Sequence, residues 1–198
     1  MRITVSAATL GLVVLAAAPC SQGLLYGQQP AKHYENSLAP YVVSPQLIVD
    51  RMLELADPKP NEMVYDLGSG DGRILITAVQ RYRAKAVGIE ISETLVRRAS
   101  DMIRRLGIEN DARVVHGDFL KVDLSPADVV TMYLATDANE LLRPSLEKDL
   151  KPGARVVSHE YAVPGWKPKL VDRDIPEGKH HVIYLYQMPQ GKMSRTKQ

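Results

Sequence analysis

The stretch that decides the fold is Val64-Tyr65-Asp66-Leu67-Gly68-Ser69-Gly70-Asp71-Gly72-Arg73-Ile74. It begins as an apolar strand, turns through three glycines that alternate with other residues, and then opens a helix. Because glycine has no Cβ, Gly68, Gly70 and Gly72 allow a sharp bend and a close approach to a ligand, with backbone amides facing it near a helix N-terminus. We therefore expect a cofactor to lie on this turn, in contact with its glycines and with Ser69.

Short apolar runs and helical patterns alternate on either side of the turn. The apolar runs suit buried parallel strands and lie at residues 63–67, 86–91, 112–116, 128–134 and 154–158. The helical patterns lie at residues 44–57, 74–83, 95–106 and 137–150. This rhythm predicts an α/β fold, a Rossmann-like doubly wound and mostly parallel seven-stranded sheet with right-handed crossovers.

Several helix ends carry residues typical of caps. Ser44, followed by a proline, is expected to be the N-cap of the opening helix. Ser92 opens the helix after the second strand and Gly107 closes it. Asp137 with Glu140 forms a capping-box-like start for the next helix.

Two further runs near the C-terminus, residues 169–173 and 181–187, are separated by Pro176, Glu177 and Gly178. Turn residues between two strand-like runs predict a hairpin. The last strand of the sheet is therefore expected to run antiparallel to the others.

Two features of the glycine turn favour S-adenosylmethionine over a dinucleotide. Asp66 ends the strand just before the glycines, where a carboxylate would repel a pyrophosphate but can accept hydrogen bonds, directly or through water, from a cationic amino-acid group. The glycine spacing is also G-x-G-x-G, whereas dinucleotide folds use G-x-G-x-x-G. Both features predict S-adenosylmethionine as the cofactor.

Acidic residues at the ends of the next two strands extend the expected cofactor site. Glu90 is well placed to accept both hydroxyls of a ribose, as an acidic residue about 20 residues beyond such a turn does in nucleotide folds. That position alone does not separate the two cofactors. Asp118 offers a carboxylate to the adenine amino group, and Phe119 offers an aromatic face to the ring. Ile91, next to Glu90, belongs to the same expected set.

These motifs carry a family resemblance. The order D-x-G-x-G-x-G, G-x-E and G-D-F over residues 63–119 resembles the class I S-adenosylmethionine-dependent methyltransferases, and the likeness in fold extends over residues 44–188. Residues 40–44, 66–74 and 151–158 look more narrowly like the small protein-lysine methyltransferases of mitochondria, which act on the ATP synthase c subunit and on the ADP/ATP carrier. The resemblance implies a protein lysine as methyl acceptor and adds Tyr41 to the cofactor-binding residues.

The same fold places the transferable methyl group just past the fourth strand, where Tyr133 and Asp137 lie. Methyl transfer mainly requires that the nucleophile and the methyl group are held in line and that water is excluded. An apolar pocket lined by Tyr133 would help a lysine to lose its proton through desolvation. Tyr133 is equally compatible with an aromatic packed on the core, and Asp137 with a plain N-cap. The run 128–134 departs from the eukaryotic members.

Other classes of site find little support. The net charge is +2, and no basic run carries interleaved aromatics, so no nucleic-acid partner is expected. No D/N-P-P-Y motif follows the fourth strand, which argues against a methyltransferase for exocyclic amines of DNA. Cys20 is the single cysteine, which excludes an intramolecular disulfide. His159 and Glu160 are two possible metal ligands without a third, so no metal site is predicted.

The termini differ from the central part of the sequence. Residues 1–23, with Arg2 before an apolar run, read as a signal peptide or signal anchor. Residues 24–40 read as a linker or arm, 41–188 as the methyltransferase domain, and 189–198 as a disordered basic tail. The leader predicts export or membrane anchoring. Arg2 favours an outside domain by the charge rule, whereas supply of a cytosolic cofactor favours the cytoplasmic face.

Two other functions remain open at this point. The chain can be a small-molecule methyltransferase, if the arm at residues 26–40 closes over the pocket. It can also be an inactive cofactor-binding module that serves in interaction or assembly. Retention of Asp66, Gly68, Gly70, Glu90 and Asp118 together argues against the second, because a degenerate fold has no physical need for them.

Overall fold

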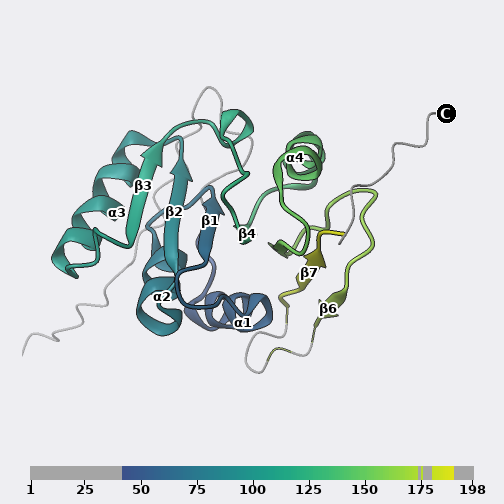
Figure 1. The fold of residues 1–198 in the computed structure, drawn as a ribbon, viewed down its shortest axis with the longest axis horizontal. Helices are drawn as coiled ribbons and strands as arrows, with labels where there is room; N and C mark the ends of the chain where they lie inside the picture. Colours follow the sequence, from purple (N-terminus) through teal and green to yellow (C-terminus); the bar gives the residue numbers. More distant parts are fainter. Residues whose placement is uncertain (1–41, 174, 176–179, 190–198) are drawn as a thin grey trace, which may run out of the picture. The chain divides into compact units, whose positions relative to one another are not determined.

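Seven strands form one mixed sheet in the part of the chain that the computed structural model describes, which is residues 42–173, 175 and 180–189. The strands are β1 (Met63–Leu67), β2 (Lys85–Glu90), β3 (Ala112–His116), β4 (Val129–Met132), β5 (Arg155–His159), β6 (Leu170–Asp172) and β7 (Ile183–Gln187). Their order across the sheet is β3-β2-β1-β4-β5-β7-β6 (Figure 1). The seven-stranded α/β sheet expected from the sequence is confirmed.

The strand directions also match the prediction. Strands β1 to β5 pair in parallel with one another, and β7 runs antiparallel both to β5 and to β6. β1 lies between β2 and β4, so the chain moves to one side of β1 first and to the other side later. Ligands of open α/β sheets bind at such a switch point, beyond the carboxyl ends of the strands.

Helices cover both faces of the sheet. They are α1 (Gln46–Ala56), α2 (Arg73–Tyr82), α3 (Glu93–Arg105), the short 3₁₀ helix η1 (Phe119–Lys121) and α4 (Thr136–Asp149). Successive strand residues point to opposite faces. Val64 accordingly belongs to the core cluster that contains α1, α2 and α3 residues, whereas Tyr65 and Leu67 belong to the cluster that contains α4 residues. Each buried aliphatic side chain contributes about 1.5–3 kcal/mol to folding.

Two predicted N-caps are wrong. Helix α1 begins at Gln46, and Pro45 occupies the cap position without a side-chain hydrogen bond. The buried hydroxyl of Ser44 instead contacts His159. Helix α4 begins at Thr136, so Asp137 is an exposed residue of its first turn and not its cap. A negative charge is still favourable there, because the helix dipole is positive at that end.

The predicted ends of α3 are confirmed. The Ser92 hydroxyl accepts a hydrogen bond from the third amide of the helix. Gly107 has a φ of 66°, in the left-handed region that glycine adopts without strain. The amides of Gly107 and Ile108 donate back to carbonyls of the last helical turn, which is the Schellman pattern.

Several sequence-based predictions lie outside the described residues. They are the leader at 1–23, the arm at 24–40, Tyr41, the turn at 176–178 and nearly all of the basic tail, at 190–198. Among the residues that are described, no helix is long and apolar enough to span a membrane.

Candidate functional site

The predicted site residues gather at one edge of the sheet. Asp66 lies near the end of β1, Glu90 ends β2, and Asp118 follows β3. Tyr133 follows β4, and His159, which was not among the predicted site residues, ends β5. Because parallel strands end at the same edge, these five positions form a row across the switch point at β1.

The glycine turn has the backbone that its sequence predicted. Gly68 and Gly72 both have a φ of 79°, a conformation that strains any residue with a side chain. A Cβ on Gly72 would also lie 3.2 Å from the Cβ of Ala99 on α3. The turn is anchored to β2, since the Gly68 amide donates to the Ile89 carbonyl at 2.9 Å. Glycine is therefore needed here for both conformation and packing.

Gly88 on β2 has a packing role that the sequence did not reveal. A Cβ at this position would lie 2.4 Å from the Ser69 hydroxyl oxygen and 2.8 Å from a methyl carbon of Leu75. The missing side chain thus lets the glycine turn sit directly on β2. The Ser69 hydroxyl itself is buried, and no hydrogen-bond partner is found for it among the described residues.

Glu90 ties the end of β2 to the turn. Its side chain is buried, and its two carboxylate oxygens accept hydrogen bonds from the backbone amides of Gly70 (2.9 Å) and Ser92 (2.8 Å). A carboxylate oxygen has more than one acceptor position. Glu90 can therefore hold the turn and still accept the hydroxyls of a ribose.

Asp66 is a buried carboxyl group with one side-chain partner. The Thr131 hydroxyl donates to Asp66 Oδ1 at 2.8 Å from the neighbouring strand β4. Burial raises the pKa of Asp66 to about 7, the nearby carboxylates of Glu90 and Asp71 add to the rise, and the Thr131 hydrogen bond opposes it. A cation placed beside Asp66 would release its proton. The sequence alone did not identify Thr131 as a site residue, because it appears there only as one hydroxyl residue in an apolar run.

Asp118 and Phe119 follow β3 in the 3₁₀ turn. Asp118 Oδ1 accepts a hydrogen bond from the Leu120 amide at 2.9 Å, and Oδ2 lies 3.6 Å from Lys121 Nζ. Phe119 is partly buried against the α4-side core. The Asp118 side chain is therefore fixed at the sheet edge and retains acceptor capacity on its other oxygen. The neighbouring Ile91 carbonyl contacts the His116 ring at 3.0 Å.

An ion pair joins the glycine turn to the segment before α1. Arg73 Nη2 lies 2.6 Å from Asp71 Oδ2, and Arg73 Nη1 donates to the Ser44 carbonyl at 2.8 Å. Burial alone would raise the pKa of Asp71, but the hydrogen bonds and charge of Arg73 hold it below its ordinary value. The turn and the chain entering α1 are thus held together by one guanidinium group.

An aromatic wall follows β4 and β5. The Tyr133 ring centroid lies 4.0 Å from that of the fully buried His159 and 6.3 Å from that of Tyr161. Burial raises the pKa of Tyr133, and the nearby Glu160 and Tyr161 add to the rise. Burial, with a smaller contribution from His181, lowers the pKa of His159 to about 4. Both rings are therefore neutral near pH 7.

Comparison with known proteins agrees with this geometry. The family model of the ANTKMT methyltransferase domain matches residues 66–170. A protein-lysine N-methyltransferase of Saccharolobus islandicus is 49% identical over 148 residues, which are 74% of this chain and 92% of that protein. The chain belongs to the ANTKMT methyltransferase family.

A more distant relative and a solved structure are also methyltransferases. The adenine nucleotide translocase lysine N-methyltransferase of Mus musculus is 37% identical over 132 residues, which are 67% of this chain and 57% of that protein. A crystal structure described as an RNA methyltransferase from Salinibacter ruber, in complex with S-adenosyl-L-homocysteine, matches with a TM-score of 0.72 and 39% identity. That match covers 79% of this chain and all of the other. The chain is an S-adenosylmethionine-dependent methyltransferase.

The edge of this methyltransferase's sheet suits its cofactor. Asp66 offers a buried carboxyl group for the cationic amino-acid part, and Glu90 and Asp118 offer acceptors for ribose and adenine. Gly68 leaves free the space that a side chain would fill on the turn, where a Cβ would lie 3.4 Å from Leu134. Of the two residues predicted to be catalytic, Tyr133 is in the aromatic wall. Asp137 is exposed in the first turn of α4.

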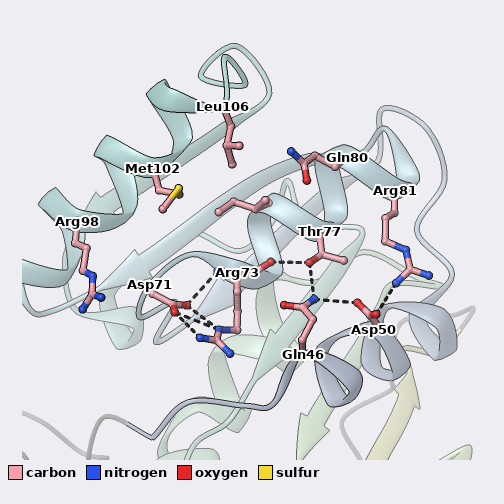
Figure 2. Close-up of a pocket in the computed structure, with 11 residues that line it drawn as sticks. Gln46, Asp50, Asp71, Arg73, Thr77, Gln80, Arg81, Arg98, Met102 and Leu106 are labelled. Atoms are coloured by element: carbon pink, nitrogen blue, oxygen red, sulfur yellow. Dashed lines mark hydrogen bonds and ion pairs between the residues drawn. The ribbon is translucent and has the colours of Figure 1, made fainter. Parts of the chain in front are cut away.

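A cavity of about 550 Å³ lies elsewhere on the methyltransferase (Figure 2). Its lining comes from α1, α2 and α3 and includes Gln46, Thr77 and Met102. It meets the glycine turn only through Asp71 and Arg73, and neither Asp66 nor Glu90 lines it. This cavity is therefore separate from the candidate cofactor site at the sheet edge.

Proposed function

We propose that the enzyme transfers methyl groups to the ε-amine of a lysine in a protein. The observation that carries the proposal is the aromatic wall of Tyr133, Tyr161 and His159 beyond β4 and β5. Register supports its position, because Met132 pairs with Leu67, so that Tyr133 follows β4 beside the glycine turn that follows β1. The names of the Saccharolobus islandicus and mouse relatives, both lysine N-methyltransferases, support the same acceptor.

The wall suits the proton chemistry of a lysine. S-adenosylmethionine supplies the electrophilic methyl group, and the acceptor nitrogen needs a free electron pair to receive it. A lysine ammonium group placed against Tyr133 and Tyr161 loses water, which lowers its pKa and favours the neutral amine. The raised pKa of Tyr133 keeps its hydroxyl protonated, so Tyr133 orients the amine by hydrogen bonding and does not act as a phenolate base.

The acceptor is tested with S-adenosylmethionine that carries a radioactive methyl group. The purified full chain is incubated separately with protein, RNA and small-molecule fractions of its source cells, and the labelled products are hydrolysed and separated. We expect the label in ε-N-methyllysine of the protein fraction. Label confined to RNA, the substrate named for the Salinibacter ruber structure, would overturn the proposal. Label confined to small molecules would overturn it as well.

Two variants of Tyr133 separate its two contributions. Tyr133→Ala removes the wall and is expected to lower kcat/KM by about 100-fold, since misplacement of the reacting groups costs that much. Tyr133→Phe keeps the ring and is expected to lose much less. Equal losses in both variants would assign the effect to the hydroxyl and contradict a desolvating wall.

We also propose that residues 1–23 attach the enzyme to a membrane, with the domain on the side where S-adenosylmethionine is made. The apolar run after Arg2 and the cofactor requirement support this placement. Fractionation of cells that produce the full chain and a chain starting at Gln28 tests it. Equal amounts of both proteins in the soluble fraction would contradict membrane attachment.

A further inference from the structure

Three possible metal ligands converge behind the aromatic wall. His181 Nδ1 lies 2.5 Å from Glu160 Oε1 and 3.0 Å from His159 Nε2, and His159 Nε2 lies 3.3 Å from Glu160 Oε1. His159 is fully buried, whereas the other two side chains are partly exposed. The sequence supplied only the pair His159 and Glu160. The third ligand comes from the segment before β7, which antiparallel pairing brings back to the end of β5.

If Glu160 is an ionised carboxylate, protons alone cannot make all three contacts favourable. If both ring nitrogens carry protons directed at Glu160, the contact between His159 Nε2 and His181 Nδ1 brings two donors together. If only one ring nitrogen carries a proton, the other ring nitrogen is bare and faces the carboxylate oxygen. Both of these atoms are acceptors, so their contact is unfavourable. One of the three contacts is therefore unfavourable in each case. A cation at the centre makes all three ligand atoms electron-pair donors to the same partner.

The backbone of Glu160 has a strained conformation. Its φ is 63°, a left-handed conformation that is uncommon for a residue with a side chain. The Glu160 amide donates to the Val182 carbonyl at 2.8 Å, and the buried Asn139 side chain donates to the Tyr161 carbonyl at 3.1 Å. Strain of this kind persists where the surroundings fix it, and it is common at functional sites.

His159 also has the outer partner that metal-binding histidines have. Its Nδ1 lies 2.9 Å from the Ser44 hydroxyl oxygen, so Nδ1 can donate its proton there while Nε2 points at Glu160 and His181. A hydrogen bond at the second ring nitrogen fixes the tautomer and the ring orientation of a metal ligand. When Nδ1 donates to Ser44 in this way, Nε2 carries the free electron pair that faces Glu160 and His181.

We propose that His159 Nε2, Glu160 Oε1 and His181 Nδ1 bind one divalent transition-metal ion of the zinc class. Two imidazoles and one carboxylate are a known zinc donor set and leave a fourth position open. Ligand distances of about 2.0–2.2 Å require the donor atoms to lie about 3.3–3.6 Å apart in a tetrahedron. Metal binding therefore requires the ligand atoms to move apart. The largest increase is needed between His181 Nδ1 and Glu160 Oε1.

The ion would stabilise the part of the enzyme next to the proposed site of the methyl acceptor. It would join the end of β5 to the segment before β7, next to the Tyr133 ring that lies tilted against His159. The partly exposed His181 provides a route for the ion to enter. This binding does not depend on the identity of the methyl acceptor.

The test measures metal binding by the full chain after removal of metals with a chelator. Dialysis against Zn²⁺ and elemental analysis give the stoichiometry, and Co²⁺ gives a visible absorption spectrum that reports its coordination. His181→Ala and Glu160→Gln remove ligands, and His180→Ala is the matched control, because His180 is the exposed neighbour outside the triangle. Circular dichroism checks the fold of each variant.

We expect one ion per chain and a low-symmetry Co²⁺ spectrum in the wild type and in His180→Ala. Affinity should fall by at least about tenfold in the two ligand variants, and Ser44→Ala should weaken binding by about 10–100-fold, as loss of an outer partner does. Absence of stoichiometric binding, or an octahedral Co²⁺ spectrum in the wild type, would overturn the proposal. Equal affinity in His181→Ala and His180→Ala would overturn it too.

Discussion

The substitution Asp66→Asn tests how burial sets the charge of Asp66 in the candidate cofactor site. Asp66 is 4% exposed, and its pKa rises from 3.8 to about 7 in the folded protein. A group whose pKa is raised on folding stabilises the protein below its unfolded pKa, and this contribution is lost as pH rises through the folded pKa. The relevant window is therefore about pH 4 to 7.

The size of the effect follows from the shift. About three pH units at 1.36 kcal/mol each correspond to at most about 4 kcal/mol. Asparagine resembles the neutral acid in shape and keeps an acceptor for the Thr131 hydroxyl. We therefore expect Asp66→Asn and the wild type to be similarly stable near pH 4, and the variant to be more stable above about pH 7.

Urea unfolding followed by circular dichroism at a series of pH values measures this difference without cofactor. Other titrating groups, such as the buried His159, occur in both proteins and cancel in the comparison. A difference in unfolding free energy that does not change with pH would refute the reasoning. It would mean that Asp66 is ionised in the folded enzyme throughout this range.

Three further substitutions test neighbouring contacts. Glu90→Gln places an amide nitrogen opposite a backbone amide, so we expect the unfolding free energy to fall by about 1–3 kcal/mol and the cofactor to bind more weakly. Thermal denaturation measures the first effect and calorimetry the second. Unchanged stability would contradict the two hydrogen bonds of Glu90. Thr131→Val removes the hydrogen-bond donor to Asp66 and should move the pH-dependent loss of stability to higher pH. An unchanged pH dependence would contradict an effect of this hydrogen bond on the pKa of Asp66. Gly88→Ala should cost about 1–3 kcal/mol in urea unfolding through overpacking, and Gly117→Ala, whose Cβ would meet nothing within 4 Å, should cost little; equal costs would refute the packing account.

Local patterns in the sequence predicted the fold and the gathering of the candidate cofactor residues at one edge of the sheet. The glycines at 68, 70 and 72 have a conformation that their type permits, and Glu90 and Asp118 follow their strands at the expected edge. These predictions succeed because parallel strands end at one edge, so short motifs after each strand meet in space. Capping was less predictable. Ser44 and Asp137 both satisfy cap patterns, but Ser44 lies one residue before the cap position of α1 and Asp137 lies within the first turn of α4.

Contacts between distant segments could not be predicted from spacing. Thr131 reaches Asp66 only because β1 and β4 pair in one register. His181 reaches Glu160 only because β7 returns antiparallel to β5. The Ser44 contact with His159 joins residues 115 positions apart. Each depends on the assembled sheet, and no local periodicity records it.

The most direct test of the account is calorimetric titration of the full chain with S-adenosylmethionine in two buffers of different ionisation enthalpy at about pH 6.5, where Asp66 is largely protonated. The account predicts one-to-one binding with release of a proton, because the cationic cofactor stabilises the Asp66 carboxylate. Release of the proton should disappear in Asp66→Asn. Binding by the wild type without proton release, or no binding by the folded chain, would contradict the assignment of the cofactor to this edge of the sheet.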